Sequence, residues 1–245
     1  MRSYILTLLL ILALVSAPAA YSQTGDPLRV GNFSRAAAGP GLPPGWEPLT
    51  FKNIPRHTEY ALVEDGGRPV LKAVSRASAS GLIRKITIDP KEYPVVAWRW
   101  KVSNIYRKGD VTQKSGDDYP ARLYITFAYA PGELGFLEKL KFETARVLYG
   151  EYPPGGALNY IWESKAPVGT IVPNPYSDRA RMVVLESGPG RLNQWVEEQR
   201  NILEDYQKAF GTPPPLISGV AVMTDSDNTG ESATAYYGDI VFTKK

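Results

Sequence analysis

The densest group of oxygen-bearing side chains lies in residues 223–232, Met-Thr-Asp-Ser-Asp-Asn-Thr-Gly-Glu-Ser. Asp225, Asp227 and Glu231 carry carboxylates at a spacing that lets the oxygens of a tight turn converge on a hard cation such as calcium. The segment departs from the helix–loop–helix calcium motif, because Tyr236 stands where that motif requires a bidentate glutamate. Two interpretations stay open: an unusual calcium loop, and a turn whose polar side chains cap their own backbone.

A second acidic pair, Asp117 and Asp118, directly precedes a strongly apolar run. Adjacent side chains of an extended chain point to opposite faces, so these two cannot form a facing catalytic pair by themselves. Asp118 and Asp225 are therefore the candidate acid and base of a carboxylate-dependent enzyme, and Asp117 is a candidate further ligand of the calcium loop. In the competing interpretation, one of the two adjacent aspartates forms a structural ion pair with Arg122 or Arg99.

Residue content excludes several other kinds of chemistry. The 245 residues include no cysteine, which rules out thiol catalysis, disulfides and thiolate-bound metal centres. The single histidine, His57, stands in a polar stretch, and the sequence has no Gly-x-Ser-x-Gly motif that would indicate a serine hydrolase. It also has no phosphate-binding loop or dinucleotide fingerprint. A formal net charge of +3 gives no reason to expect nucleic-acid binding.

Short strands are the elements expected to position these groups. Runs of alternating or wholly apolar residues recur between turn signals, and they cover residues 60–63, 70–74, 81–88, 95–102, 121–129, 158–164, 181–187, 217–224 and 236–242. This pattern predicts an all-β fold, a two-sheet antiparallel β-sandwich of jelly-roll type. We expect one domain over residues 49–245, preceded by an irregular lead-in over residues 24–48 that is rich in glycine and proline.

One helix is expected to interrupt the strands. Apolar residues recur at helical spacing over residues 194–210, Asn193 is a suitable N-cap, and Gly211 is placed to end the segment. We expect this helix to pack against the sandwich. A second, less regular helical pattern covers residues 135–148.

Alternation within two of the strands separates apolar from polar side chains. In residues 95–102 and 121–129, large apolar side chains occupy every second position and polar ones the positions between. If the two strands are neighbours, Arg99, Arg122 and Tyr124 emerge together on a surface away from the core. A ligand-binding face is one interpretation of this surface, and ordinary solvent-facing charge is the other.

The run at residues 158–164 adds Asn159 and Glu163 to the expected polar face. Aromatic side chains are a further resource for ligand contact, because flat apolar surfaces such as sugar rings stack on them. Three tryptophans fall at expected core positions: Trp98, Trp100 and Trp195. The aromatic residues left for contact with a ligand are Trp162, Tyr160, Tyr124, Tyr236 and Tyr237.

The first 23 residues have the order of a secretory signal peptide. Arg2 is followed by an apolar run from Tyr4 to Val15 and then by small residues. The apolar run is shorter than the roughly 20 residues that span a bilayer. We therefore expect cleavage of this segment and export of the remaining chain to the periplasm or the outside of the cell.

Several segments, taken together and in order, resemble the bacterial family catalogued as domain of unknown function 3047. They are residues 98–102, 116–124, 158–164, 220–230 and 237–240. The resemblance extends from Trp46 to Phe242 and implies membership of the family, but it implies no activity and no catalytic residues. The closing aromatic-Gly-Asp-Ile-Val strand is also similar to that of jelly-roll carbohydrate-binding modules.

These observations favour an exported, non-catalytic binding module for a glycan or another envelope ligand. The expected ligand-binding residues are Arg99, Arg122, Tyr124, Asn159 and Glu163. Two alternatives remain: a carboxylate-dependent hydrolase or lyase acting on an extracellular polymer, and a structural envelope protein that binds a partner through an exposed apolar patch. Calcium is the one cofactor that the sequence suggests, and oligomeric state is not indicated.

Overall fold

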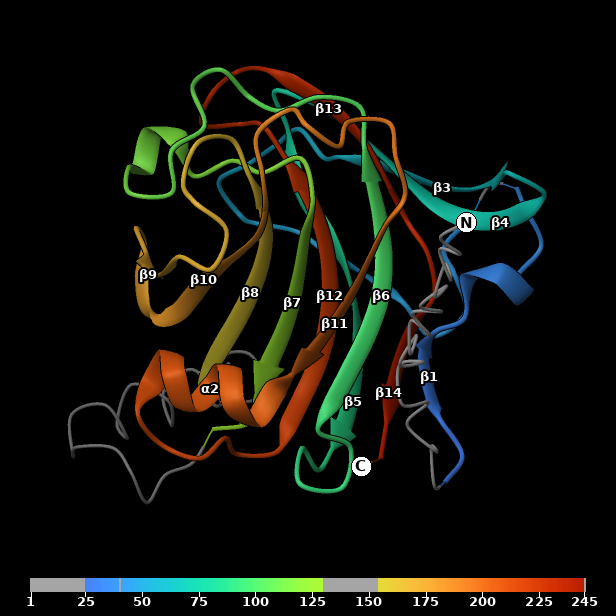
Figure 1. The fold of residues 1–245 in the computed structure, drawn as a ribbon. Helices are drawn as coiled ribbons and strands as arrows, with labels where there is room; N and C mark the ends of the chain where they lie inside the picture. Colours follow the sequence, from blue (N-terminus) through green and yellow to red (C-terminus); the bar gives the residue numbers. More distant parts are fainter. Residues whose placement is uncertain (1–24, 40, 130–153, 245) are drawn as a thin grey trace, which may run out of the picture.

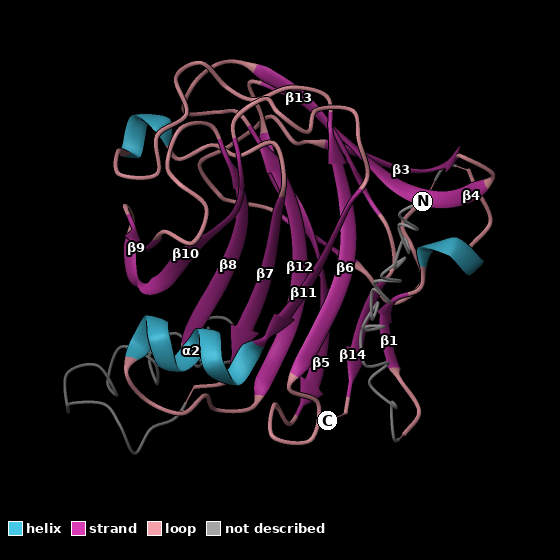
Figure 2. Cartoon of the chain, viewed as in Figure 1, coloured by secondary structure: helices cyan, strands magenta, loops and turns pink. Residues whose placement is uncertain are grey.

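The computed structural model describes residues 25–39, 41–129 and 154–244, which form two seven-stranded sheets packed face to face (Figures 1 and 2). The predicted all-β, two-sheet sandwich is confirmed. The segment interpreted as a signal peptide and the helical pattern at residues 135–148 lie outside the described residues.

The first sheet has the strand order β1-β14-β6-β13-β4-β3, and β11 pairs with β6 off this path. Its strands are β1 (Leu28–Gly31), β3 (Glu59–Asp65), β4 (Arg68–Arg76), β6 (Val95–Val102), β11 (Val196–Asn201), β13 (Ser232–Tyr237) and β14 (Ile240–Thr243). All of its pairs are antiparallel.

The second sheet has the order β2-β5-β12-β7-β8-β10-β9. Its strands are β2 (Glu47–Leu49), β5 (Ala79–Ile88), β7 (Arg122–Phe127), β8 (Gly156–Glu163), β9 (Ile171–Asn174), β10 (Ser177–Ser187) and β12 (Ile217–Asp225). One pair, β8 with β10, is parallel, and the others are antiparallel. Two short 3₁₀ turns, η1 (Phe33–Arg35) and η2 (Lys114–Gly116), complete the outline with the helix α2 (Ile202–Phe210).

Every predicted apolar run is a strand, and the last run is two strands. β13 and β14 pair in succession with the same edge of β6, and Gly238 and Asp239 separate them. Gly238 donates its backbone N–H to the carbonyl of Arg99 at 2.9 Å, and a Cβ at this position would lie 2.5 Å from the Arg99 Cγ. The glycine is therefore required where the Arg99 side chain crosses the chain.

The residues expected as an irregular lead-in contribute a strand to each sheet. β1 pairs with β14 in the first sheet, and β2, which begins within the lead-in, pairs with β5 in the second. Trp46 is buried and its ring lies 5.4 Å from that of Phe33. Strands of three or four residues carry too few alternating positions to be recognised in the sequence.

The predicted helix is present, but it is about half as long as expected. Residues 196–201 form β11, which pairs with β6, and only Ile202–Phe210 are helical. Asn201, not Asn193, caps the helix: its side chain accepts hydrogen bonds from the backbone N–H groups of Leu203 and Glu204. The glutamates, glutamine and arginine at residues 197–200 are good helix formers, but propensity is a weak preference, and pairing with the free edge of β6 overrides it.

Aromatic side chains fill the space between the sheets. Trp98 and Trp100 from the first sheet meet Tyr160 and Trp162 from the second, with ring centroids 5.3 and 6.2 Å apart. α2 crosses one end of the sandwich near β7 and β8 (Figure 1), where the Tyr160 hydroxyl donates to the buried Asp205 at 2.9 Å. Tyr160, Trp162 and the similarly buried Tyr237 are therefore core residues, and their interpretation as ligand contacts was wrong.

Candidate ligand-binding pocket on the second sheet

A pocket of about 610 Å³ opens on the face of the second sheet that points away from the first sheet. Leu123 of β7 belongs to the core, so the alternate residues Arg122 and Tyr124 point outward into the pocket. Met223 of β12 stands beside Arg122 in the strand register, and Asp225 follows on the same face. Alternation in two adjacent strands thus builds a polar pocket floor.

Arg122 and Asp225 form a buried bidentate ion pair across β7 and β12. The Arg122 Nε donates to Asp225 Oδ1 at 2.8 Å, and its Nη2 donates to Asp225 Oδ2. Nη2 also donates to the backbone carbonyl of Asp117 at 2.5 Å, and Nη1 donates to the Tyr124 hydroxyl at 3.0 Å. Both members of the pair are at most 3% exposed. The guanidinium is held on three sides by the protein, so its main role is to fix the floor.

Tyr124 and Tyr119 complete this buried group. Burial raises the pKa of Tyr124 to about 12, which keeps the phenol protonated at neutral pH. The Tyr119 ring lies against the Arg122 guanidinium, with the Cζ atom 4.3 Å from the ring centroid. A planar cation packed on an aromatic face has little freedom to reorient.

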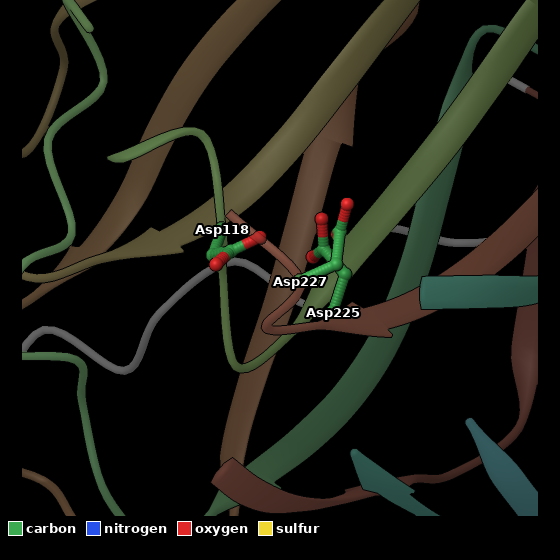
Figure 3. Close-up of side chains that lie close together, drawn as sticks. All are labelled: Asp118, Asp225 and Asp227. Carbon is green, nitrogen blue, oxygen red and sulfur yellow. The ribbon is translucent and has the colours of Figure 1, made fainter. Parts of the chain in front are cut away.

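Three carboxylates, one of them that of Asp225 in the ion pair, lie close together (Figure 3). Asp118 lies after η2, Asp225 ends β12 and Asp227 stands in the turn that follows, and one oxygen of each lies within 4.8 Å of the others. Burial raises the pKa of the half-buried Asp227, and the neighbouring Asp118 carboxylate raises it further. The sequence suggested Asp118 with Asp225 as an acid–base pair, and Asp225 with Asp227 as metal ligands. It did not predict that all three form one group, because Asp118 is more than 100 residues away from the other two.

The hydrogen bonds of this group favour turn capping over a calcium loop. Asp118 accepts the backbone N–H of Asn228 at 3.3 Å and that of Thr229 at 2.5 Å, so it holds the turn after β12. Both oxygens of Asp225 accept from Arg122. A calcium ion needs six to eight oxygen ligands, and here two of the three carboxylates already bind donors of the protein.

The remaining predicted metal ligands do not join the three carboxylates. Glu231 accepts the backbone N–H groups of Arg107 and Lys108, at 3.2 and 2.9 Å, and so fixes the loop after β6. Asp117 lines the pocket, and its Oδ1 lies 3.9 Å from the Arg122 Nη1. The expected structural ion pair between Arg122 and one of the adjacent aspartates is thus present as a long contact, beside the much closer pair with Asp225.

Arg99 does not share a face with the other predicted ligand-binding residues. β6 and β7 belong to different sheets, so the expectation that they are neighbours was wrong. The chain between them crosses from one sheet to the other, which period-two alternation cannot reveal. Arg99 lies on the outer face of the first sheet, where its guanidinium stacks 4.3 Å from the Trp195 ring centroid. It borders a separate pocket of about 510 Å³.

Asn159 and Glu163 of β8 lie beside the pocket but are buried. Glu163 accepts the backbone N–H groups of Val111, Lys165 and Ala166, which makes it a loop-capping residue. Asn159 donates its Nδ2 to the Met182 sulfur at 3.3 Å. Of the five residues predicted to bind ligand, Arg122 and Tyr124 line this pocket, and the other three do not.

The rim of the pocket carries two exposed aromatic residues that sequence reasoning missed. Phe51 is 38% exposed and Tyr176 is 57% exposed, and both line the pocket. The Tyr176 hydroxyl accepts from Asn228 Nδ2 at 2.8 Å, which ties the β9–β10 turn to the turn after β12. The Asn174-Pro175 sequence marked a turn here, but nothing local indicated that this turn borders a pocket.

A second hollow of about 820 Å³ follows the same face of the sheet. It is lined by Leu49 of β2, Ile83 of β5 and Thr126 of β7, and it shares Thr50 with the first pocket. Thr126 lies two residues beyond Tyr124, on the same side of β7. The two hollows therefore run one after the other along the strands.

No helix in residues 25–39, 41–129 and 154–244 is long and apolar enough to cross a bilayer.

Known proteins that resemble this chain are found among solved structures and protein families. No curated protein matches the sequence. Among solved structures, the chain is similar to the Emp47p carbohydrate recognition domain (10% identity, 88% of this chain and 94% of that one, TM-score 0.42). It is also similar to a family 30 carbohydrate-binding module of a cellulosomal cellulase of Clostridium thermocellum (12%, 90% and 94%, TM-score 0.33).

A third similar structure is an enzyme, the endoglucanase 3 of family GH12 from Trichoderma harzianum (8% identity, 84% of this chain and 100% of that one, TM-score 0.38). The fold of the present chain is established by its own strand pairing and not by these distant likenesses. The model of one protein family matches residues 44–241, and the chain therefore belongs to the family described as "Protein of unknown function (DUF3047)".

Proposed function

We propose that this protein is a non-catalytic carbohydrate-binding module that holds its ligand in the pocket on the outer face of the second sheet. The observation that carries the proposal is the pair of exposed aromatic side chains, Phe51 and Tyr176, at the rim of a pocket with a polar floor. Sugar rings combine apolar C–H faces with hydroxyl groups, so aromatic rims and polar floors suit them.

The floor supports this function because it is rigid. Arg122 donates hydrogen bonds both to Asp225 on the adjacent strand and to Tyr124 on its own strand. Side chains on strands, locked by their neighbours, lose little conformational entropy when a ligand binds. The pocket is thus organised before the ligand arrives.

The second hollow favours an elongated ligand. It continues along the same face from Tyr124 toward Thr126, and Thr50 borders both hollows. A single sugar would fill only part of this surface, whereas an oligosaccharide or a polysaccharide chain would lie along both hollows.

The competing function is a carboxylate-dependent hydrolase, with Asp118 and Asp225 as acid and base. The close approach of their carboxylates, within 4.8 Å, favours it. Against it, Asp225 is bound at both oxygens by Arg122, and Asp118 caps a turn. A general acid or base must exchange a proton with its substrate, and neither carboxylate is free to do so.

Export to the periplasm or the cell exterior is part of this proposal, and it is supported by the signal-like pattern of the first 23 residues. An extracellular glycan or an envelope polysaccharide is the ligand class that fits this location.

The test is titration calorimetry of the purified chain against a panel of neutral and charged oligosaccharides. Binding of at least one class is expected, and Tyr176→Ala should weaken it by about two- to tenfold, since one stacked ring contributes about 0.5–1.5 kcal/mol. Tyr236→Ala, on the outer face of the first sheet, is the matched control and should bind as the wild type does. If Tyr236→Ala loses binding and Tyr176→Ala does not, the ligand binds on the first sheet and the proposed pocket is not its site. Release of new reducing ends from an oligosaccharide would show that the protein is an enzyme.

A further inference from the structure

Arg99 and Arg122 are both held in place, but only Arg122 uses its hydrogen-bond donors within the protein. The Arg122 guanidinium donates to Asp225, to Tyr124 and to a backbone carbonyl. The Arg99 guanidinium donates no hydrogen bond to any residue that the structure describes, and it forms no ion pair with their carboxylates. The five N–H groups of Arg99 are therefore left for water or for a ligand.

The Arg99 side chain is nevertheless fixed in position. Its stem crosses Gly238, where a Cβ would lie 2.5 Å from the Arg99 Cγ, and its guanidinium stacks 4.3 Å from the Trp195 ring centroid. The Trp195 indole N–H donates to Asp65 at 2.7 Å, and the same carboxylate is paired with Lys101 at 2.8 Å. A guanidinium held on an aromatic face, with its edges free, is organised in advance to bind a planar oxyanion.

The pocket of about 510 Å³ that Arg99 borders has an apolar floor and polar walls. Val241, Ala97 and Gln199 lie side by side on β14, β6 and β11, and all three line the pocket. Arg68, exposed at the start of β4, is a second cation at this pocket and forms no ion pair with the described residues. The volume is within the range of small-molecule sites.

The acidic groups at this pocket limit how much negative charge a ligand can carry. Glu197 is exposed beside Arg99 in the strand register. Asp239 accepts the backbone N–H and the hydroxyl of Ser34, at 2.8 and 2.6 Å. Burial raises the pKa of the Glu198 carboxyl to about 7, which reduces its charge at neutral pH. These groups would repel a phosphate dianion, whereas a single carboxylate can pair with Arg99.

We infer that this pocket is a second binding site, which takes an acidic sugar residue and pairs its carboxylate with Arg99. A planar carboxylate accepts two parallel N–H bonds from a guanidinium, and such bidentate pairs are strong and specific. The apolar C–H face of the sugar ring packs on Ala97 and Val241, and the Gln199 amide is placed to bind hydroxyl groups. The site lies on the first sheet, so the inference does not depend on the proposed function.

The experiment compares trigalacturonate with its methyl ester, which has the same sugar chain without the negative charge, by titration calorimetry. The acid is expected to bind at least about tenfold more tightly than the ester, the gain of a hydrogen-bonded charge pair. Arg99→Gln should remove most of this difference, and Gln199→Glu should weaken binding of the acid by placing a like charge in the pocket. Arg107→Gln, at a side chain that is 93% exposed and outside the pocket, is the matched control and should bind as the wild type does.

Thermal melting shows whether each variant is folded. Arg99 is half-buried, so the exposed Arg68→Gln and Gln199→Glu provide the readout if Arg99→Gln does not fold. Tyr176 and Tyr236 do not line this pocket. The variants Tyr176→Ala and Tyr236→Ala should therefore bind the acid as the wild type does, which separates a failure of this inference from a failure of the proposed function.

Equal binding of the acid and its ester, or no binding of the acid, would overturn this inference. Binding of the acid that Tyr176→Ala weakens and Arg99→Gln does not would also overturn it, because the ligand would then lie on the second sheet. Inorganic phosphate that binds more tightly than trigalacturonate, with the same dependence on Arg99, would replace the carboxylate site by a phosphate site.

Discussion

Arg122 and Asp225 face each other across β7 and β12 as a bidentate ion pair that is almost completely removed from solvent. They are separated by 103 residues in sequence, yet they form the centre of the polar pocket floor. Asp117, Tyr119 and Tyr124 all contact this arginine. The pair therefore links the stability of the second sheet to the shape of the proposed binding site.

Removing one member of this pair should be strongly destabilising. Arg122→Met or Asp225→Leu leaves the partner charge buried without compensation, and each should lower the free energy of unfolding by about 3–5 kcal/mol. In the double variant Arg122→Met/Asp225→Leu both charges are gone, so a large part of the loss should be recovered. Urea denaturation of all four proteins measures the coupling.

The control for that cycle is the exposed ion pair between Arg76 and Glu59, whose side chains are 65% and 72% exposed. Arg76→Ala should cost no more than about 1 kcal/mol, because water screens an exposed pair. Equal losses for Arg76→Ala and Arg122→Met would contradict the assigned burial.

Glu198 should make stability depend on pH. Burial raises the pKa of its carboxyl from the ordinary 4.5 to about 7, and the nearby Glu186 carboxylate contributes, against the opposing effects of Trp100, Arg191 and Arg200. Between pH 4.5 and about 7 the folded protein holds this proton more tightly than the unfolded chain. The stabilising contribution is therefore complete below pH 4.5 and is lost as the pH rises through about 7.

Measuring the free energy of unfolding across this range for the wild type and for Glu198→Gln tests the assignment. The amide cannot ionise, so the variant should show a flatter profile. Its matched control is the exposed Glu197→Gln on the same strand, which should keep the wild-type slope. Identical profiles for the wild type and Glu198→Gln would show that Glu198 titrates normally.

The true start of α2 can be tested through its cap. Asn201 accepts the Leu203 N–H at 3.1 Å, so Asn201→Ala should cost about 1 kcal/mol of stability. Asn193 has a φ of 59°, in the left-handed region that glycine adopts readily. Asn193→Gly should therefore leave the melting temperature unchanged or raise it slightly. If Asn193 were the cap instead, Asn193→Ala would lower the stability by about 1 kcal/mol and Asn201→Ala would not.

The alternating patterns of this sequence were sufficient to predict its longer strands, but not β1, β2, β9 or β11. In residues 95–102, for example, Trp98 and Trp100 point to the core as their spacing indicates. This succeeded because the direction of a side chain in a strand depends on its immediate neighbours along the chain. The same reasoning failed for residues 196–201, because their conformation is decided by pairing with β6.

The sequence alone determined that this chain forms a two-sheet β-sandwich, and it identified Arg122, Tyr124, Asp118, Asp225 and Asp227 as residues of interest. Only the tertiary structure decided that Arg99 lies on the other sheet, that Arg122 is bound to Asp225, and that Tyr176 borders the pocket. The physical reason is the range of the interactions: strand formation follows from local alternation, whereas a pocket assembles from segments whose proximity depends on strand pairing across the whole chain.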